Sequence, residues 1–195
     1  KIKLSRDRVD RLGFFTQVDI ETQEVPGSPD QVDLMINVVE KPTGSIQLGA
    51  GFSSAEKVSL SFGIKQENVF GSGNYLGLDI NTSKYNRNLV LSTTDPYFTQ
   101  DGISRTVDLY YRTSRPYSYY YDGLSVDTDD MYKIVSKGAA IKFGVPFSEI
   151  DTVFFGLGVE QTTIKDGLYM PVEYQSYINQ FGATSNAIPL TVGWS

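Results

Sequence analysis

Strict alternation of apolar and polar side chains is the sequence feature that most limits how this chain can fold. It begins after Gly44 and recurs in about eight segments down to Trp194. The first segment is typical, because Ile46, Leu48 and Ala50 alternate with small or polar residues. A period of two is typical of a β-strand with one apolar face. Successive strands with no helical pattern between them favour consecutive antiparallel pairing.

The two faces of these strands favour a membrane-spanning barrel over a soluble β-sandwich or a lipocalin-like barrel. The apolar face is uninterrupted, whereas the other face carries small and charged residues, as expected for lipid outside and water inside. The links also alternate, since 113–130 and 161–187 are long and 146–151 is short. No run of about 18 apolar residues is present, so the sequence contains no transmembrane helix.

The first part of the chain has a different pattern. Residues 1–13 predict a helix that ends at Gly13, and residues 16–23 and 31–40 predict two strands of a hairpin around the turn 26–30. One helix and one hairpin are too small to bury a core of their own. We therefore interpret this segment as the end of a small α+β module.

The alternation is interrupted at the Lys-Pro-Thr-Gly segment 41–44, where we place a domain boundary. Residues 1–42 then form the end of the α+β module and residues 43–195 form the barrel segment. The sequence starts at Lys1 and ends within a strand-like pattern. We therefore expect it to be a piece of a longer protein.

The composition argues against several classes of function. The net charge is −6, whereas a nucleic-acid-binding protein needs a basic face. Histidine and cysteine are both absent, which removes Ser–His and Cys–His catalysis and the commonest metal ligands. We expect no catalytic residue, no cofactor, no metal site and no nucleic-acid partner.

Three residue clusters have ordinary structural explanations. Gly71-Ser72-Gly73-Asn74 lacks the Lys-Ser/Thr and the helix of a phosphate loop, and it predicts a turn. An acidic cluster without EF-hand spacing predicts a solvated loop, with weak divalent-ion binding as the alternative. A tyrosine cluster predicts an interfacial girdle or loop packing, with a stacking platform as the alternative. The acidic residues are Asp122, Asp127, Asp129 and Asp130, and the tyrosines are Tyr117, Tyr119, Tyr120 and Tyr121 beside Arg112 and Arg115.

Three motifs, in this order, resemble the BamA family of outer-membrane protein assembly factors. Arg-Leu-Gly-Phe-Phe at 11–15, followed by Glu-Lys-Pro-Thr-Gly-Ser at 40–45, is similar to the family's junction between the last periplasmic POTRA domain and the barrel. The segments 66–74 and 95–104 are similar to two of its turns, Q-x-N-x-x-G-x-G and N/D-P-Y-F-T-x-D-G-x-S. Beyond about residue 105 the resemblance lies in strand spacing only.

The resemblance implies a mainly β fold in the bacterial outer membrane. The chain would hold the α-β-β end of the last POTRA domain, in the periplasm. It would continue as the N-terminal half, about eight strands, of an antiparallel transmembrane β-barrel. With the POTRA part in the periplasm, the long links 113–130 and 161–187 would face the cell exterior.

The resemblance also implies a non-enzymatic assembly factor that folds and inserts β-barrel proteins. A client strand would add to a lateral gate formed by the first barrel strand. The implied partners are nascent outer-membrane β-barrel proteins, accessory periplasmic lipoproteins and outer-membrane lipid. The predicted gate residues are Gly44, Ser45, Ile46, Gln47, Leu48, Gly49, Ala50, Gly51, Phe52 and Ser53.

Two other functions are open at this point. One is a polypeptide transporter of the two-partner-secretion type, from the same superfamily. The other is an outer-membrane phospholipase-type barrel, although this sequence supplies no histidine for its usual Ser–His chemistry.

Overall fold

The chain divides into two compact units, Lys1–Gly44 and Ser45–Ser195. The computed structural model describes residues 1–54, 57–115, 120–121, 124–125, 132–165, 167 and 172–195. None of the described helices is long and apolar enough to span a membrane.

The first unit is a helix followed by a hairpin, in the order that the sequence predicts. Its elements are α1 (Ile2–Arg11), β1 (Phe15–Val25) and β2 (Ser28–Glu40). Gly13 lies just beyond the helix, with a φ of 75°, a left-handed conformation that glycine adopts without a side-chain penalty. Val25 pairs with Ser28, so the hairpin turn is the two-residue Pro26–Gly27 segment.

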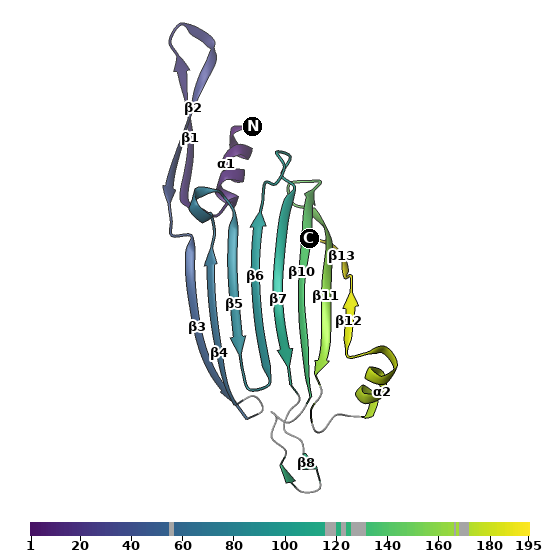
Figure 1. Ribbon diagram of the computed structural model, residues 1–195. Helices are drawn as coiled ribbons and strands as arrows, with labels where there is room; N and C mark the ends of the chain where they lie inside the picture. Colours follow the sequence, from purple (N-terminus) through teal and green to yellow (C-terminus); the bar gives the residue numbers. More distant parts are fainter. Residues whose placement is uncertain (55–56, 116–119, 122–123, 126–131, 166, 168–171) are drawn as a thin grey trace. The chain divides into compact units, whose positions relative to one another are not determined.

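The second unit is built on one antiparallel sheet, which has nine strands over the described residues (Figure 1). The strands are β3 (Gly44–Ser53), β4 (Lys57–Gln66), β5 (Tyr75–Thr82), β6 (Asn86–Asp95), β7 (Ser104–Ser114), β10 (Lys133–Pro146), β11 (Thr152–Lys165), β12 (Thr184–Ala187) and β13 (Leu190–Trp194). Their spatial order is β12-β11-β10-β7-β6-β5-β4-β3, and β13 also pairs with β11. The predicted mainly β, antiparallel fold is confirmed, and over the described residues the sheet is open.

The two ends of the sheet carry different connections. The links 67–74, 96–103 and 147–151 are short and lie at one end, which we call the short-turn end. The links that follow β7 and β11 lie at the opposite end, the long-loop end. Four small elements lie within the links: the 3₁₀ turn η1 (Val69–Gly71), β8 (Tyr120–Tyr121), β9 (Leu124–Ser125) and α2 (Val172–Phe181).

The cross-strand register collects the alternating residues on separate faces, which we call the apolar face and the polar face. One row of directly paired residues on the apolar face is entirely aliphatic: Ile64, Leu78, Leu91, Leu109, Ala139 and Val159. A row on the polar face is entirely hydrophilic: Ser61, Asn81, Asn88, Arg112, Ser136 and Thr162. A one-residue slip in register would exchange these faces, so the alternation fixes the pairing.

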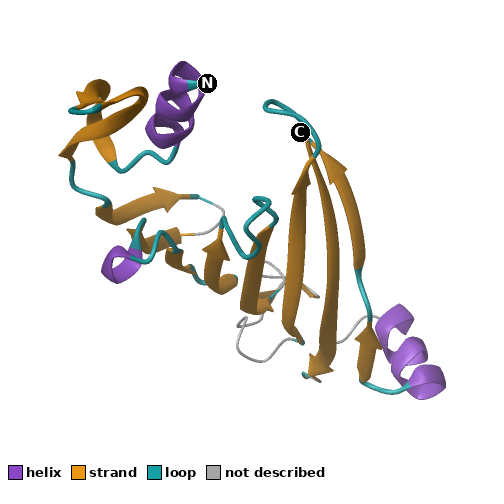
Figure 2. Cartoon of the chain, turned by 90° about the horizontal axis from the view of Figure 1, so that it is seen from above, coloured by secondary structure: helices purple, strands orange, loops and turns teal. Residues whose placement is uncertain are grey.

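The C-terminal part of the sheet differs from the sequence prediction in two ways. Helix α2 interrupts the link 161–187 and lies beside β12 in both views (Figure 1, Figure 2). The predicted link also contains strand β12, and the last predicted strand, from Ile188 to Trp194, begins only at Leu190 as β13. Pro189 separates β12 from β13, because it has no N–H for the ladder with β11. The Gly158 N–H still donates to the Pro189 carbonyl, at 3.0 Å.

Candidate functional site: the β3 edge

Strand β3 is one edge of the sheet, and it contains all ten residues predicted to form the gate. In the described part of the chain it pairs with β4 only. All ten residues are exposed, and Ile46, Leu48 and Phe52 are 69%, 78% and 76% exposed. An edge strand presents a row of backbone N–H and C=O groups to any extended chain that approaches. The β3 edge is therefore a surface on which another strand can add.

Glycine on β3 and serine on β4 set how these two strands meet. A β-carbon added to Gly49 would overlap the Ser61 hydroxyl, and one added to Gly51 would lie 3.0 Å from Ser59 Oγ. The Ser59 hydroxyl donates to the Gly51 carbonyl at 3.4 Å. Glycine leaves no side chain to hold a strand against its neighbour. At these two positions the polar face of the β3–β4 contact is therefore formed by small side chains.

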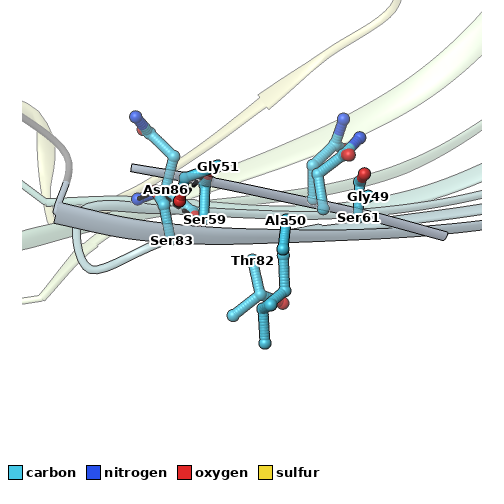
Figure 3. Close-up of a pocket in the computed structure, with 11 residues that line it drawn as sticks. Gly49, Ala50, Gly51, Ser59, Ser61, Thr82, Ser83 and Asn86 are labelled. Atoms are coloured by element: carbon cyan, nitrogen blue, oxygen red, sulfur yellow. Dashed lines mark hydrogen bonds between the residues drawn. The ribbon is translucent and has the colours of Figure 1, made fainter. Parts of the chain in front are cut away.

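A hollow of about 470 Å³ lies on the polar face beside this contact (Figure 3). Ser59, Ser61, Ser83 and Asn86 lie on one side of the sheet in this view, and Thr82 projects from the other side. The lining is completed by Gly49, Ala50, Gly51, Leu60, Asn81 and Asn88. The Asn88 Oδ1 atom is buried without a hydrogen-bond partner. The hollow therefore offers hydroxyl and amide groups to a polar main chain or side chain.

The described residues of this edge supply hydrogen-bonding and apolar groups. The described residues that line the hollow are glycine, alanine, leucine, serine, threonine and asparagine, none of which titrates near neutral pH. No group of three or more His, Cys, Asp or Glu among the described residues is placed to hold a metal ion. The β3 edge supplies backbone donors and acceptors flanked by apolar residues on one face and hydroxyl groups on the other. These are the features of strand addition.

Charged groups on the polar face lie further along the sheet, and of these groups sequence reasoning singled out Arg112 only. The Tyr110 hydroxyl on β7 donates to the Glu160 carboxylate on β11, across β10. The Arg112 guanidinium lies 4.9 Å from the centre of the Tyr110 ring. Ser92 donates to Asp108 in the same part of the sheet. The alternation places all of these residues on the polar face, but the cross-strand partners depend on the register.

The Gly71–Asn74 segment is a turn, as predicted. It joins β4 to β5, and the Gly73 N–H donates to Asn68 Oδ1 at 2.7 Å. Asn68, Phe70 and Gly71 all have positive φ, at 57°, 51° and 76°. The hydrogen bond that the Asn68 side chain accepts therefore stabilises a tight turn, and the backbone does not continue into a helix.

The other two clusters are only partly described. Asp122, Asp127, Asp129 and Asp130 lie outside the described residues, as do Tyr117 and Tyr119. Arg112 lies on the polar face beside Tyr110, and Arg115 follows the end of β7. The loop interpretation of the acidic cluster and the girdle interpretation of the tyrosines stay predictions.

The family of the chain follows from comparison with known proteins. The model of the Omp85 superfamily domain matches residues 68–195. The chain belongs to the Omp85 superfamily. The relationship predicted from the three motifs is confirmed by this match and by the similarity to BamA proteins that follows.

The similarity to individual Omp85-related proteins extends over the whole chain. The outer membrane protein assembly factor BamA of Neisseria meningitidis serogroup B is 35% identical over 195 residues, which are 100% of this chain and 24% of that protein. BamA of Buchnera aphidicola is 27% identical over 85% of this chain and 25% of its own length. The chain thus spans about a quarter of the length of these relatives.

A chloroplast protein and a crystal structure extend this comparison. The outer envelope protein 80 of rice is 25% identical over 96% of this chain and 29% of its own length. The crystal structure of BamA from Haemophilus ducreyi lacking POTRA domains 1–3 matches with a TM-score of 0.76 and 28% identity, and covers 99% of this chain and 37% of that chain. The Omp85 fold of this chain is thus supported in sequence and in structure.

Proposed function

We propose that this chain is part of an outer-membrane protein assembly factor of bacteria, in which the β3 edge receives a strand of the protein being inserted. The observation that carries the proposal is the exposed ten-residue strand β3, which pairs on one side only over the described residues. The similar BamA proteins are named as assembly factors, which favours assembly over polypeptide transport or lipid hydrolysis.

The two faces of the sheet support a location within a lipid bilayer. The aliphatic row on the apolar face runs unbroken across six strands, whereas the paired row on the polar face is hydrophilic. Such alternation is typical of an outer-membrane barrel with lipid outside and water inside. The sheet then forms the N-terminal half of the barrel wall, and the helix and hairpin of the first unit form the end of a periplasmic POTRA domain.

The physical basis for strand addition is the absence of water in the bilayer core. An unpaired backbone N–H or C=O group costs several kcal/mol in hydrocarbon, so a client strand that pairs with β3 is strongly favoured over an unpaired one. The apolar side chains of β3 then remain against lipid, and Gln47 remains on the polar face. Accessory periplasmic lipoproteins would act on the first unit and on the approaching client.

Site-specific photo-crosslinking in the full-length protein tests this proposal. Probes at Ser45, Gln47 and Gly49 should trap a nascent barrel protein, because these residues lie on the edge strand. Matched probes at Asp108 and Lys142, on the polar face of inner strands, should not. Equal trapping by all five probes, or none by the β3 probes, would overturn the gate assignment.

Cysteine labelling tests the orientation. Ser176 lies in α2 at the long-loop end, and Ser148 lies in the turn 147–151 at the short-turn end. With the first unit in the periplasm, an impermeant maleimide on intact cells should label Ser176→Cys and not Ser148→Cys. The opposite labelling would invert the orientation. Ser118, in the other long link, lies outside the described residues.

A further inference from the structure

Basic side chains gather on the apolar face, close to the long-loop end of the sheet. We call Arg87, Lys133, Lys137 and Lys165 the basic cluster. Lys137 lies on the same face as Ala139, two residues nearer the long-loop end, and it pairs with Tyr111 and Gln161. Lys133 pairs directly with Lys165. Arg87 pairs with Thr113, which pairs with Val135 between the two lysines of β10.

The basic cluster is compact. It spans β6 to β11, which are three strand spacings apart, or about 15 Å. Thr113 and Val135, at its centre in the register, are only 9% and 7% exposed. Long basic side chains can cover apolar neighbours with their stems while the charged ends reach polar surroundings. The four charges therefore lie around one small area at the border of the apolar face.

Acidic residues of the described strands do not balance these charges on the same face. Asp79, Asp108 and Glu160 alternate with the aliphatic residues and lie on the polar face. Asp95 shares the apolar face but ends β6 at the short-turn end, where it pairs with Arg105. Cations facing lipid are costly unless they reach an anionic partner at the membrane surface. Any anionic partner of the cluster therefore comes from outside these strands.

A groove on the apolar face adjoins the basic cluster. It has a volume of about 740 Å³, and Lys137 lies on its border. Leu89, Leu91, Leu109 and Val159 supply its apolar walls, and Gly138 adds no side chain to its floor. A volume of this size is within the usual range for a small-molecule site. An apolar groove beside a set of cations matches a molecule with a hydrocarbon chain and an anionic head.

We propose that the basic cluster and this groove bind a membrane lipid that carries an anionic phosphate head group. The phosphate contacts the lysines and Arg87, and an acyl chain lies in the groove. The proposal rests on the membrane location in the proposed function and not on strand addition at β3. In the proposed orientation the lipid belongs to the external leaflet, because the cluster lies at the long-loop end.

Lipid binding to the full-length protein in neutral detergent tests this site. Native mass spectrometry would compare phosphatidic acid, diacylglycerol with the same acyl chains, and inorganic phosphate. We expect tight binding of phosphatidic acid and weak binding of the other two. K133Q/K137Q should weaken phosphatidic acid binding by about 25-fold, or fivefold for each cation removed. The matched control K65Q/K142Q removes the same charge from the polar face and should change binding less than twofold.

Each result decides the proposal. Equal binding of phosphatidic acid and diacylglycerol would reject a phosphate site, and tight binding of inorganic phosphate alone would reject a lipid. Unchanged binding by K133Q/K137Q would reject this location. Photo-crosslinking at Ser45 in the same variants separates this proposal from the gate, because K133Q/K137Q should still trap a client. If the full-length protein stayed in solution without detergent and bound none of the three probes, the membrane location itself would be contradicted.

Discussion

The β3 edge and the β10–β11 pair are parts of one sheet with the same alternation, yet they differ in the side-chain contacts that join each strand to its neighbours. β10 and β11 pair over fourteen residues each, from Lys133 to Pro146 and from Thr152 to Lys165. Ser136 and Thr162 form a hydrogen bond across this pair at 3.3 Å, and Tyr110 spans β10 to reach Glu160. β3 is ten residues long, fully exposed, and meets β4 through glycine and serine.

The comparison shows that the period-two pattern determines faces but not how firmly each strand is held. Both regions have an apolar face suited to lipid. On the polar face, the β10–β11 pair also contains glycines, but Tyr110 reaches over Gly138 to Glu160 and the Lys142 ammonium lies 5.1 Å from the centre of the Phe154 ring. At the β3 edge, Gly49 and Gly51 meet only the small side chains of Ser61 and Ser59. An inner strand and an edge strand of this sheet can thus have the same alternation. The difference lies in the side chains of the polar face and in the position within the sheet.

Proline substitution should have the largest effect, on folding when it is placed in β10 and on client insertion when it is placed in β3. Ala140→Pro on β10 removes a ladder N–H between two partner strands and should cost about 3 kcal/mol or more. The protein should lose its folded, heat-modifiable form on electrophoresis. Gln47→Pro and Leu48→Pro on β3 test the edge, because successive N–H groups of an antiparallel strand point to opposite sides. One variant should fold and lose client insertion, and the other should weaken the β3–β4 pairing. Normal insertion by both would contradict the role of β3.

Removal of the Tyr110 hydroxyl should have an intermediate effect, on the free energy of unfolding. Tyr110→Phe leaves the ring in place and removes the hydrogen bond to Glu160, which should lower the free energy of unfolding by about 2 kcal/mol. Urea titration of the lipid-reconstituted protein, followed by tryptophan fluorescence, measures this change. Tyr75→Phe on β5 is the matched control and should stay within about 0.5 kcal/mol. Equal losses in the two variants would show that the bridge does not hold the wall.

A methyl group added at Gly49 should have the smallest effect, and a second substitution at Ser61 should offset it. Gly49→Ala places a methyl group against the Ser61 hydroxyl and should cost about 1 kcal/mol of unfolding free energy. Ser61→Ala removes the hydroxyl, so the double variant should recover most of this loss in a double-mutant cycle. Additive losses would mean that Gly49 and Ser61 do not limit each other. Hydrogen exchange of the β3 amides would show whether the edge is held more firmly in the double variant.

The sheet could be predicted because each strand is specified by the alternation of its own residues. Alternation around Ile46, Leu78 or Ile141 identifies each strand, and the bounds Gly44–Ser53 of β3 coincide with the predicted first strand. The turns at Pro26–Gly27 and at Asn68–Gly73 are equally local, since glycine or asparagine occupies every positive-φ position in them except Phe70. The proposed role of β3 as a gate is not local, because it depends on how another chain would pair with this strand.

Helix α2 shows how a local signal can be overlooked. Tyr174, Tyr177, Ile178 and Phe181 have the i, i+3, i+4, i+7 spacing of a helix face, and Gly182 ends it with a φ of 88°. The length of the link alone favours a loop, whereas this spacing within it is that of a helix. The basic cluster was missed for another reason. Lys133 and Lys165 are 32 positions apart in the chain, and only the register of β10 with β11 makes them neighbours.

Pairing between strands that are neighbours in the sequence has a consequence for the speed and order of assembly. Apart from the step from β7 to β10 and the shared partner of β12 and β13, each strand of the sheet pairs with the strand next to it along the chain. Contacts between nearby segments lose little chain entropy on forming, so a topology of this kind has a low contact order for a β protein. If the N-terminal strands fold first, the sheet can therefore grow by one hairpin at a time, and the last strand of each hairpin is the edge on which the next one pairs.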